Sequence, residues 1–203
     1  MQSVEWEREV ETVRLRDGMP ILIRPVRPDD ALRLKALFGR LSRESIYYRF
    51  LELRKELPNE EARQLAELDY HTQMALVATR QKGGDDEVIG VARYVLVPGS
   101  EPAEAEAAVV VEDRYQNLGL GTHLLNRLAA YAVRHGVCAF LATVRFDNAR
   151  VLCLIRRSGL PTESRLEAGV LALRIGLESE EARAGGVMHN REEGERPCLS
   201  AIV

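Results

Sequence analysis

The chain has 203 residues, with 28 Lys and Arg against 31 Asp and Glu, which gives a formal net charge of −3. This even balance argues against a protein that coats nucleic acid or an anionic membrane, because such proteins carry a strong excess of basic residues. Hydrophobic residues make up 46% of the chain and charged residues 29%, as in ordinary globular proteins. No window holds the roughly 18 apolar residues that a membrane helix needs.

The N-terminus is acidic and has no apolar core of a secretory signal, so we expect no leader. Cys138, Cys153 and Cys198 are odd in number and form no CxxC pair, which suits a reducing compartment. The four His residues show no HExxH spacing, so no metal site is expected. These features predict a cytoplasmic protein without a metal, and they leave monomer and homodimer equally open.

The negative charge is concentrated at the C-terminus. Residues 178–203 contain six acids and three bases, which leaves residues 1–177 with equal numbers of each. This tail is poor in large apolar residues and cannot offset the entropy of ordering, so we expect it to be disordered. The predicted organisation is an N-terminal extension over 1–11, one domain over 12–177 and an acidic tail over 178–203.

In the first half of the chain, residues 12–25 predict two short strands around an Asp-Gly turn. A helix should follow, capped by Asp29 or Asp30, and Ser42 should begin a second helix. A third helix is expected to open at Pro58.

The second half begins with two strands over 73–81 and 87–97, joined by a glycine-rich turn. The remaining predicted elements follow in chain order: a strand over 105–112, an amphipathic helix over 119–135, an apolar strand over 137–144, a helix over 148–158 and a last strand over 168–177. This order predicts a mixed α/β fold around one sheet.

The segment between strand 105–112 and the next helix contains Gln116, Gly119 and Gly121 at Gln-x-x-Gly-x-Gly spacing. Such a turn presents backbone N–H groups at the positive end of a helix dipole, and the absent Cβ atoms let phosphates approach closely. Each such charge-assisted hydrogen bond contributes roughly 1.5–3 kcal/mol. The turn therefore predicts a diphosphate site.

The common nucleotide motifs do not match this turn. A Walker A loop needs Gly-Lys-Ser/Thr, whereas Gly121 is followed by Thr122 and His123. A dinucleotide-binding turn needs a third glycine where Leu124 stands. Taken alone, the glycine pair is explained equally well by tight packing of a helix on a strand.

The turn resembles the acyl-CoA pyrophosphate loop of the GNAT-type N-acetyltransferase superfamily. The segment VRFDNARVLCLIRRSGL is similar to the superfamily's second cofactor motif, and IRPVRPDDALRLKALFGRLSRESIYYRFLE resembles the acetyltransferase domain of bacterial Pat-type protein lysine acetyltransferases. Matching blocks run through residues 12–177. The resemblance implies a GNAT-like mixed, mostly antiparallel central sheet flanked by helices on both faces.

The resemblance to the GNAT superfamily also implies acetyl-CoA as cosubstrate. The residues that correspond to the cofactor-binding positions are Val109, Val110, Val111, Gln116, Asn117, Leu118, Gly119, Leu120, Gly121, Thr122 and Asn148. In the superfamily the strand at Val109–Val111 leaves its neighbour and pairs with the pantetheine, and one of its N–H groups holds the thioester oxygen. Nearby arginines could meet the phosphates; they are Arg114, Arg145, Arg150, Arg156 and Arg157.

The general base implied by the resemblance is Glu106, ten residues before Gln116. The residues alone favour a solvated strand glutamate at Glu106, and Glu104 would share its face; only the resemblance favours Glu106 as the base. Where many members carry a tyrosine as general acid, this chain has Ile155; Tyr94 and Tyr115 are possible substitutes.

The leading hypothesis is an N-acetyltransferase that moves an acetyl group from acetyl-CoA to a primary amine, with a protein lysine as acceptor. The alternatives are acetylation of a small amine or amino acid, and a non-catalytic acyl-CoA sensor. Neither nucleic acid nor a membrane is expected as a partner. Cys153 lies in an apolar LCLI run and is expected in the core.

Overall fold

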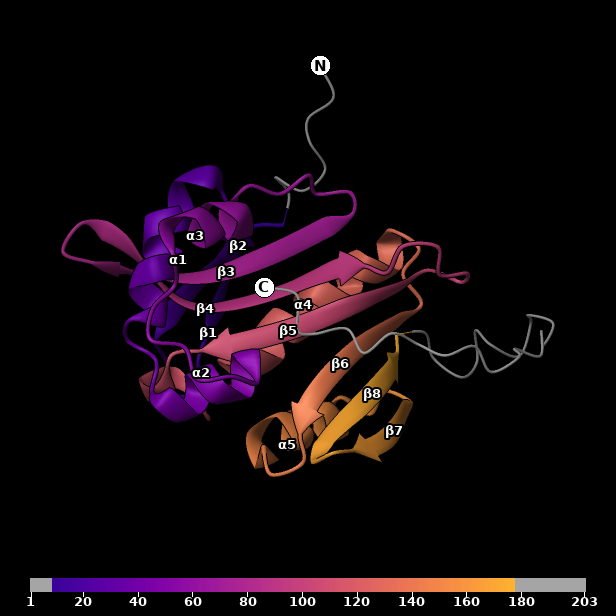
Figure 1. Ribbon diagram of the computed structural model, residues 1–203. Helices are drawn as coiled ribbons and strands as arrows, with labels where there is room; N and C mark the ends of the chain where they lie inside the picture. Colours follow the sequence, from indigo (N-terminus) through magenta and orange to yellow (C-terminus); the bar gives the residue numbers. More distant parts are fainter. Residues whose placement is uncertain (1–8, 178–203) are drawn as a thin grey trace, which may run out of the picture.

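The computed structural model describes residues 9–177, and these form an eight-stranded sheet covered by helices (Figure 1). The predicted acidic tail and most of the N-terminal extension lie outside the described residues. The strands are β1 (Glu11–Arg14), β2 (Pro20–Pro25), β3 (Gln73–Lys82), β4 (Asp85–Leu96), β5 (Glu104–Val111), β6 (Ala139–Arg145), β7 (Thr162–Glu167) and β8 (Val170–Gly176). Their order is β1-β2-β3-β4-β5-β6-β8-β7, and β5–β6 is the one parallel pair among them.

Helices cover both faces of this sheet. They are α1 (Ala31–Phe38), α2 (Arg43–Phe50), α3 (Asn59–Ala66), α4 (Leu120–Arg134) and α5 (Ala149–Ser158). Figure 1 shows α1, α2 and α3 on one face and α4 on the other, with α5 beside β6 and β8. The predicted fold, a mostly antiparallel mixed sheet with helices on both faces, is confirmed.

Two local predictions differ from the structure. Strand β7 was not predicted, because its sequence TESRLE lacks apolar alternation and all six of its residues are exposed. Asp30 does not cap α1 with its side chain. It is fully buried and accepts two hydrogen bonds from the Arg24 guanidinium, at 2.6 and 2.8 Å. By contrast, Ser42 caps α2 as predicted, because its hydroxyl accepts from the Ser45 N–H at 3.1 Å.

The sheet opens between β5 and β6. These strands pair only over Glu104–Glu106 and Ala139–Leu141. Beyond Glu106, β5 stays paired with β4 as far as Val111, whereas β6 follows β8 as far as Arg145. The divergence predicted near Val109–Val111 therefore begins directly after Glu106.

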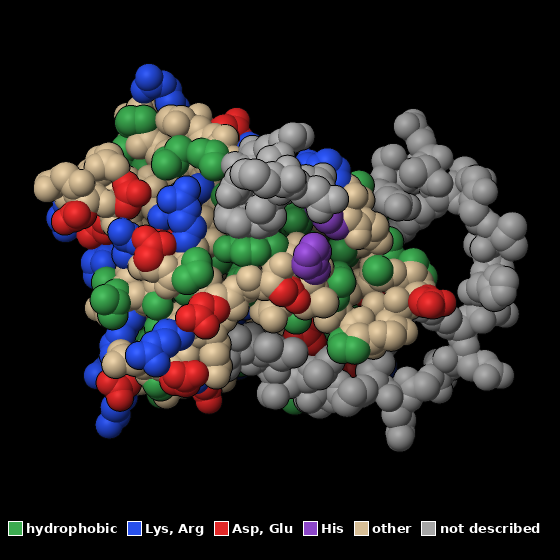
Figure 2. Space-filling view, turned by 90° about the horizontal axis from the view of Figure 1, so that it is seen from above, with side chains coloured by type: hydrophobic (Ala, Val, Ile, Leu, Met, Phe, Trp, Pro, Cys, Tyr) green, Lys and Arg blue, Asp and Glu red, His purple; other side chains and the backbone are tan. Residues whose placement is uncertain are grey.

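The charges on the surface are mixed. Where side chains are visible in Figure 2, Lys and Arg alternate with Asp and Glu and form no extended patch of one sign. Within residues 9–177, no helix is long and apolar enough to cross a membrane.

Candidate active site

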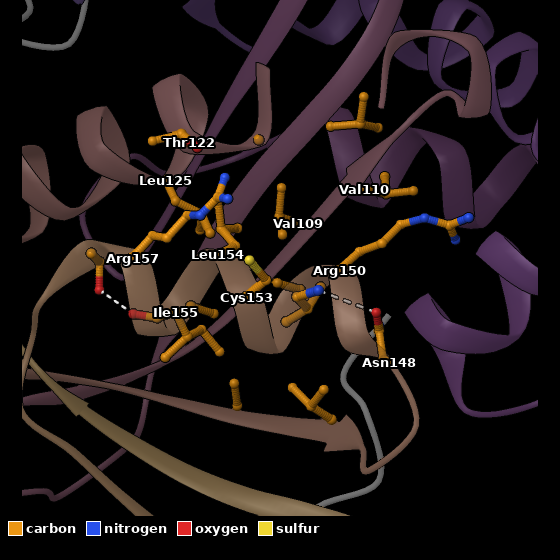
Figure 3. A pocket seen from close by; sticks show the side chains of 18 of the residues that line it. Val109, Val110, Thr122, Leu125, Asn148, Arg150, Cys153, Leu154, Ile155 and Arg157 are labelled. Carbon is orange, nitrogen blue, oxygen red and sulfur yellow. Dashed lines mark hydrogen bonds between the residues drawn. The ribbon is translucent and has the colours of Figure 1, made fainter. Parts of the chain in front are cut away.

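A cavity of about 430 Å³ occupies the gap between the diverging strands (Figure 3). Its walls come from residues 107–111 of β5, residues 142–144 of β6, the start of α4 and one side of α5. Successive strand residues point to opposite faces, and all five residues from Ala107 to Val111 line the cavity. The cavity therefore reaches both faces of the sheet at this gap.

The glycine turn forms one end of the cavity. Asn117 and Gly119 both have positive φ, +62° and +93°, and the first bond of α4 runs from the His123 N–H to the Gly119 oxygen at 3.1 Å. The N–H groups just before His123 therefore belong to the helix turn that has no intrahelical acceptors. Arg16, which also lines the cavity, holds the turn, because its own N–H donates to the Leu118 oxygen and its guanidinium to the Asn117 oxygen, at 3.1 and 3.2 Å.

Most of the predicted cofactor residues are brought together in this cavity. Those that line it are Val109, Val110, Val111, Gln116, Asn117, Gly119, Gly121, Thr122 and Asn148. The side chains of Leu118 and Leu120 belong instead to the hydrophobic core beneath the turn. These two residues can contribute only backbone groups to a ligand.

The Gln116 side chain connects the turn to α2. Its amide nitrogen donates to the Val111 oxygen at 2.9 Å and to the Ser45 hydroxyl at 3.0 Å. Ser45 donates in turn to Asp113 at 2.8 Å, and so does Ser42 at 2.6 Å. Burial raises the pKa of Asp113, but the hydrogen bonds from Ser42 and Ser45 outweigh it, so the net pKa is lowered. This network fixes α2 against the end of β5.

Asn148 caps the start of helix α5, because its side-chain oxygen accepts from the Val151 N–H at 3.2 Å. Of the five predicted arginines, Arg150 and Arg157 line the cavity. Arg150 pairs with Glu44 of α2 at 3.0 Å. Arg157 forms no ion pair with a described residue, and it points from α5 toward Thr122 and Leu125 of α4 (Figure 3).

The apolar side of α5 faces the cavity and not a closed core. None of its residues is buried, and Cys153, Leu154 and Ile155 line the cavity. The expectation that Cys153 lies in the core is therefore wrong.

The two tyrosines considered as general acids do not line the cavity. Tyr94 and Tyr115 are 1% and 4% exposed, and neither is among the lining residues. Tyr48 of α2 is the one tyrosine that lines it among the described residues. Sequence reasoning missed Tyr48, together with its neighbours Ser45 and Arg49, because no cofactor motif covers α2.

Glu104 and Glu106 share a face of β5 but have different surroundings. Glu104 is 4% exposed and pairs with Arg174 of β8 at 2.7 Å. Glu106 is half-buried and has no ion pair with a described residue, and burial raises the pKa of its carboxyl. It does not itself line the cavity, but Ala108, the next residue on its face, does.

A mixed sheet that opens beside a glycine turn at a helix N-terminus is the arrangement expected of an acyl-CoA-dependent acetyltransferase. The chain belongs to the GNAT acetyltransferase family, because the model of the "Acetyltransferase (GNAT) family" matches residues 41–159. The predictions of the family and of an acetyltransferase are thereby confirmed. The GNAT family uses acetyl-CoA.

Similar proteins agree with this assignment. The chain is 37% identical over 134 residues to "Acetyltransferase PA5475" of Pseudomonas aeruginosa, covering 66% of this chain and 70% of that protein. It is 34% identical over 148 residues to "Acetyltransferase Pat" of Mycolicibacterium smegmatis, covering 72% of this chain but only 43% of that longer protein.

Among solved structures, the GNAT domain of S. lividans PAT superposes with a TM-score of 0.75 at 31% identity, covering 83% of this chain and 97% of that domain. The acetyltransferase yncA from Salmonella typhimurium, solved with its cofactor acetyl-CoA, has a TM-score of 0.58 at 21% identity, covering 79% of this chain and 95% of that one. At that identity the second likeness shows the fold alone.

Proposed function

We propose that this protein transfers an acetyl group from acetyl-CoA to the side-chain amine of a protein lysine, with Glu106 as general base. The proposal rests on the position at which strands β5 and β6 stop pairing. Glu106 is the last residue of β5 that pairs with β6, and the cavity beyond it reaches both faces of the sheet. A thioester on the α4 face and an amine on the α2 face could therefore meet beside Glu106.

The residues around the cavity fit acetyl-CoA, which supplies the acetyl group as a thioester. The backbone N–H groups of residues 117–122 would hold the pyrophosphate at the start of α4. Val109–Val111 have no partner strand on the β6 side, so their backbone can bind the pantetheine amides and the thioester oxygen. Arg157 and Asn148 would contact the polar parts of the cofactor, while Leu154 would contact its apolar arm.

A lysine amine has a pKa of about 10.4 and must lose a proton before it can attack. Glu106 would take that proton through one bridging water, since its neighbour Ala108 lines the cavity and Glu106 does not. The nitrogen then bonds to the acetyl carbon as the carbon–sulfur bond breaks, and the sulfur leaves with the electron pair. The nitrogen's second proton passes to this thiolate through water, which leaves a neutral amide and CoA thiol. Because burial raises the pKa of Glu106, its carboxylate is a stronger base than an exposed one.

The choice of a protein lysine as acceptor rests on the sequence resemblance to Pat-type protein lysine acetyltransferases, and two of the comparisons are with proteins of the Pat name. One is the likeness to a protein named Pat over 72% of this chain, and the other is the superposition on the GNAT domain of S. lividans PAT. An assay of CoA release with acetyl-CoA, run against a panel of small amines and a panel of proteins, tests this choice. Mass spectrometry of the acetylated product would locate the acetyl group on a lysine if the proposal holds.

The sharpest test of the mechanism is Glu106→Gln. We expect turnover to fall by about 10²–10⁴ while the affinity for acetyl-CoA stays the same. In the parent enzyme, kcat/KM should rise with pH as Glu106 ionises, with an apparent pKa above that of an exposed glutamate, and this limb should vanish in the variant.

Glu104→Gln is the matched control on the same face of the same strand. It leaves Arg174 without its close partner at 2.7 Å, so it should lower the melting temperature but keep the turnover of the folded enzyme. Equal turnover in Glu106→Gln and the parent at saturating substrates would refute the role of Glu106.

A further inference from the structure

Two arginines on the α2 face of the sheet have no ion pair with a described carboxylate; Arg93 is buried and Arg49 is partly exposed. Arg93 of β4 is 7% exposed, and its only hydrogen bond with a described residue runs from Nη2 to the Gln73 side-chain oxygen at 3.3 Å. Its Nε is buried and has no partner in the described part of the chain. Burial lowers the pKa of Arg93 to about 10.

Arg49 of α2 is the second member of the pair, and it lines the cavity. Its guanidinium lies 4.9 Å from the centre of the Phe50 ring, and it forms no ion pair within residues 9–177. Burial, followed by the charges of Arg93 and Arg54, lowers the pKa of Arg49 to about 10. The charge of Arg54 is already neutralised by ion pairs with Glu52 and Glu61.

The strand register places Arg93 next to the proposed base. Arg93 lies opposite Ala108, and Glu106 lies opposite Val95, so Arg93 and Glu106 are diagonal neighbours on one face. Residues in that relation are about 7–8 Å apart. Ala108 and Arg49 line the cavity, whereas Arg93 does not line it but lies opposite Ala108 in the strand register. The two arginines therefore lie on the α2 face next to Glu106, from which we expect an amine to approach.

Charged side chains are rarely buried unless they are paired, because desolvation is costly. The same chain shows the paired arrangement at Arg24, which is 3% exposed and binds Asp30 through two hydrogen bonds. Arg93 is buried almost as deeply and has no such acid. An anion from outside the described chain would satisfy both Arg93 and Arg49.

We propose that Arg49 and Arg93 form a binding site for a carboxylate carried by the acceptor. This inference rests on the proposed acetyl transfer to an amine. The guanidinium fork matches a carboxylate through two parallel hydrogen bonds. The carboxylate belongs either to a small amino acid that is itself acetylated or to an Asp or Glu close to the acetylated lysine of a protein. The site selects acceptors in which an amine and a carboxylate lie a few bonds or one residue apart.

The test compares acceptors that differ only in the carboxylate. L-lysine is paired with 1,5-diaminopentane, and a lysine peptide with a neighbouring Glu is paired with the same peptide carrying Gln. In the parent enzyme, kcat/KM should be about tenfold or more higher for the acidic member of at least one pair. The pair that shows the preference identifies the source of the carboxylate.

In Arg93→Met and in Arg49→Met the ratio of kcat/KM between the acidic and the neutral member of the pair should fall to near unity. Arg63→Met is the control, because Arg63 is an exposed arginine of α3 that pairs with Glu60. Arg93→Met should fold at least as stably as the parent, since replacing an unpaired buried charge by an apolar side chain removes a desolvation cost. Arg93→Lys keeps the charge without the fork and should retain only part of the preference.

A binding measurement without acetyl-CoA separates this proposal from the acetyl transfer itself. Glutarate, used as a carboxylate probe, should raise the melting temperature of the parent and of Arg63→Met, but not of Arg93→Met. If glutarate binds in this way and no amine is acetylated, the carboxylate site stands and the proposed function fails. If amines are acetylated with no preference in either pair and glutarate leaves the melting temperature unchanged, the carboxylate site is refuted and the function stands.

Discussion

Helices α4 and α5 face the same cavity from two differently packed parts of the molecule. Helix α4 belongs to the body, residues 9–136, and it buries Leu120, Leu124, Leu128, Tyr131 and Ala132. Helix α5 belongs to the arm, residues 137–177, and none of its residues is buried. Val137 and Phe140 are the only arm residues among the buried members of the three hydrophobic clusters found in the described chain.

The strands show the same contrast. In the body, β3 and β4 pair along ten residues each, whereas the strand pairing between arm and body is limited to three residue pairs of β5 and β6, to which the ion pairs of Arg174 with Glu104 and of Arg150 with Glu44 are added. At the outer edge all of β7 is exposed. Apolar side chains of the arm therefore remain available to contact a ligand, whereas those of the body are buried in its own core. We expect the arm to be the less stable part of the molecule until a ligand is bound.

The largest expected effect is on the free energy of unfolding, and two leucine truncations, one in the body and one in the arm, measure it. Leu124 is fully buried in α4, so Leu124→Ala should lower the free energy of unfolding by about 2–5 kcal/mol. Leu154 lies on the cavity side of α5 and is half-exposed, so Leu154→Ala should cost at most about 1 kcal/mol. It should instead weaken acetyl-CoA binding, by about tenfold.

Denaturant unfolding and calorimetric titration of both variants provide the two measurements. Similar losses of stability in the two variants would show that α5 is held in a core like that of α4. A Leu154→Ala variant with the affinity of the parent would show that the apolar side of α5 does not contact the cofactor.

The second prediction concerns the parent protein with and without CoA. At a concentration about 100 times its dissociation constant, CoA should stabilise the native state by about 2.7 kcal/mol. If the arm is the weakly held part, the slowing of amide hydrogen exchange should be largest in α5 and β8, and smallest in β3 and β4. An equal slowing across all four elements would contradict the division into body and arm.

The cavity was predictable where its residues follow a local backbone pattern. Gln116, Gly119 and Asn148 sit at fixed positions around helix starts, and all three line the cavity. A glycine at a helix start is readable from the local pattern, whereas the roles of Gln116 and Asn148 follow from the resemblance to the GNAT superfamily motifs. The role of the Gln116 side chain was less accessible, because its partner Ser45 is 71 residues away.

The residues on the α2 face of the cavity, where we expect the acceptor, could not be predicted either, because contacts between distant segments bring them together. Arg49 and Tyr48 reach the cavity because α2 packs on β5 through the Ser45 and Asp113 contacts. No pattern in the sequence predicts that α2 packs there. Arg93 is the one charged residue in the apolar run over 88–97 of an ordinary strand. Only the strand register shows that it is a neighbour of Glu106 and that no described acid accompanies it.

The smallest expected effect comes from two glycines at opposite ends of α4. Gly119 has φ +93° at the start of the helix and Gly136 has φ +79° just after its end. A Cβ at Gly136 would meet nothing within 4 Å, and one at Gly119 would only reach the Arg16 side chain at 4.0 Å. Neither substitution therefore creates a clash, and the cost of each comes from the left-handed backbone, about 1–2 kcal/mol.

Gly119→Ala and Gly136→Ala should thus lose similar amounts of stability in thermal unfolding. Their affinities for acetyl-CoA should differ, because only Gly119 lies in the turn whose N–H groups would hold the pyrophosphate, and its Cβ would stand beside those groups. Weaker binding in Gly119→Ala alone would support cofactor binding at that end of α4. Equal binding in both variants would mean that the turn serves to pack α4 on the body and that the phosphates are held by α5 of the arm.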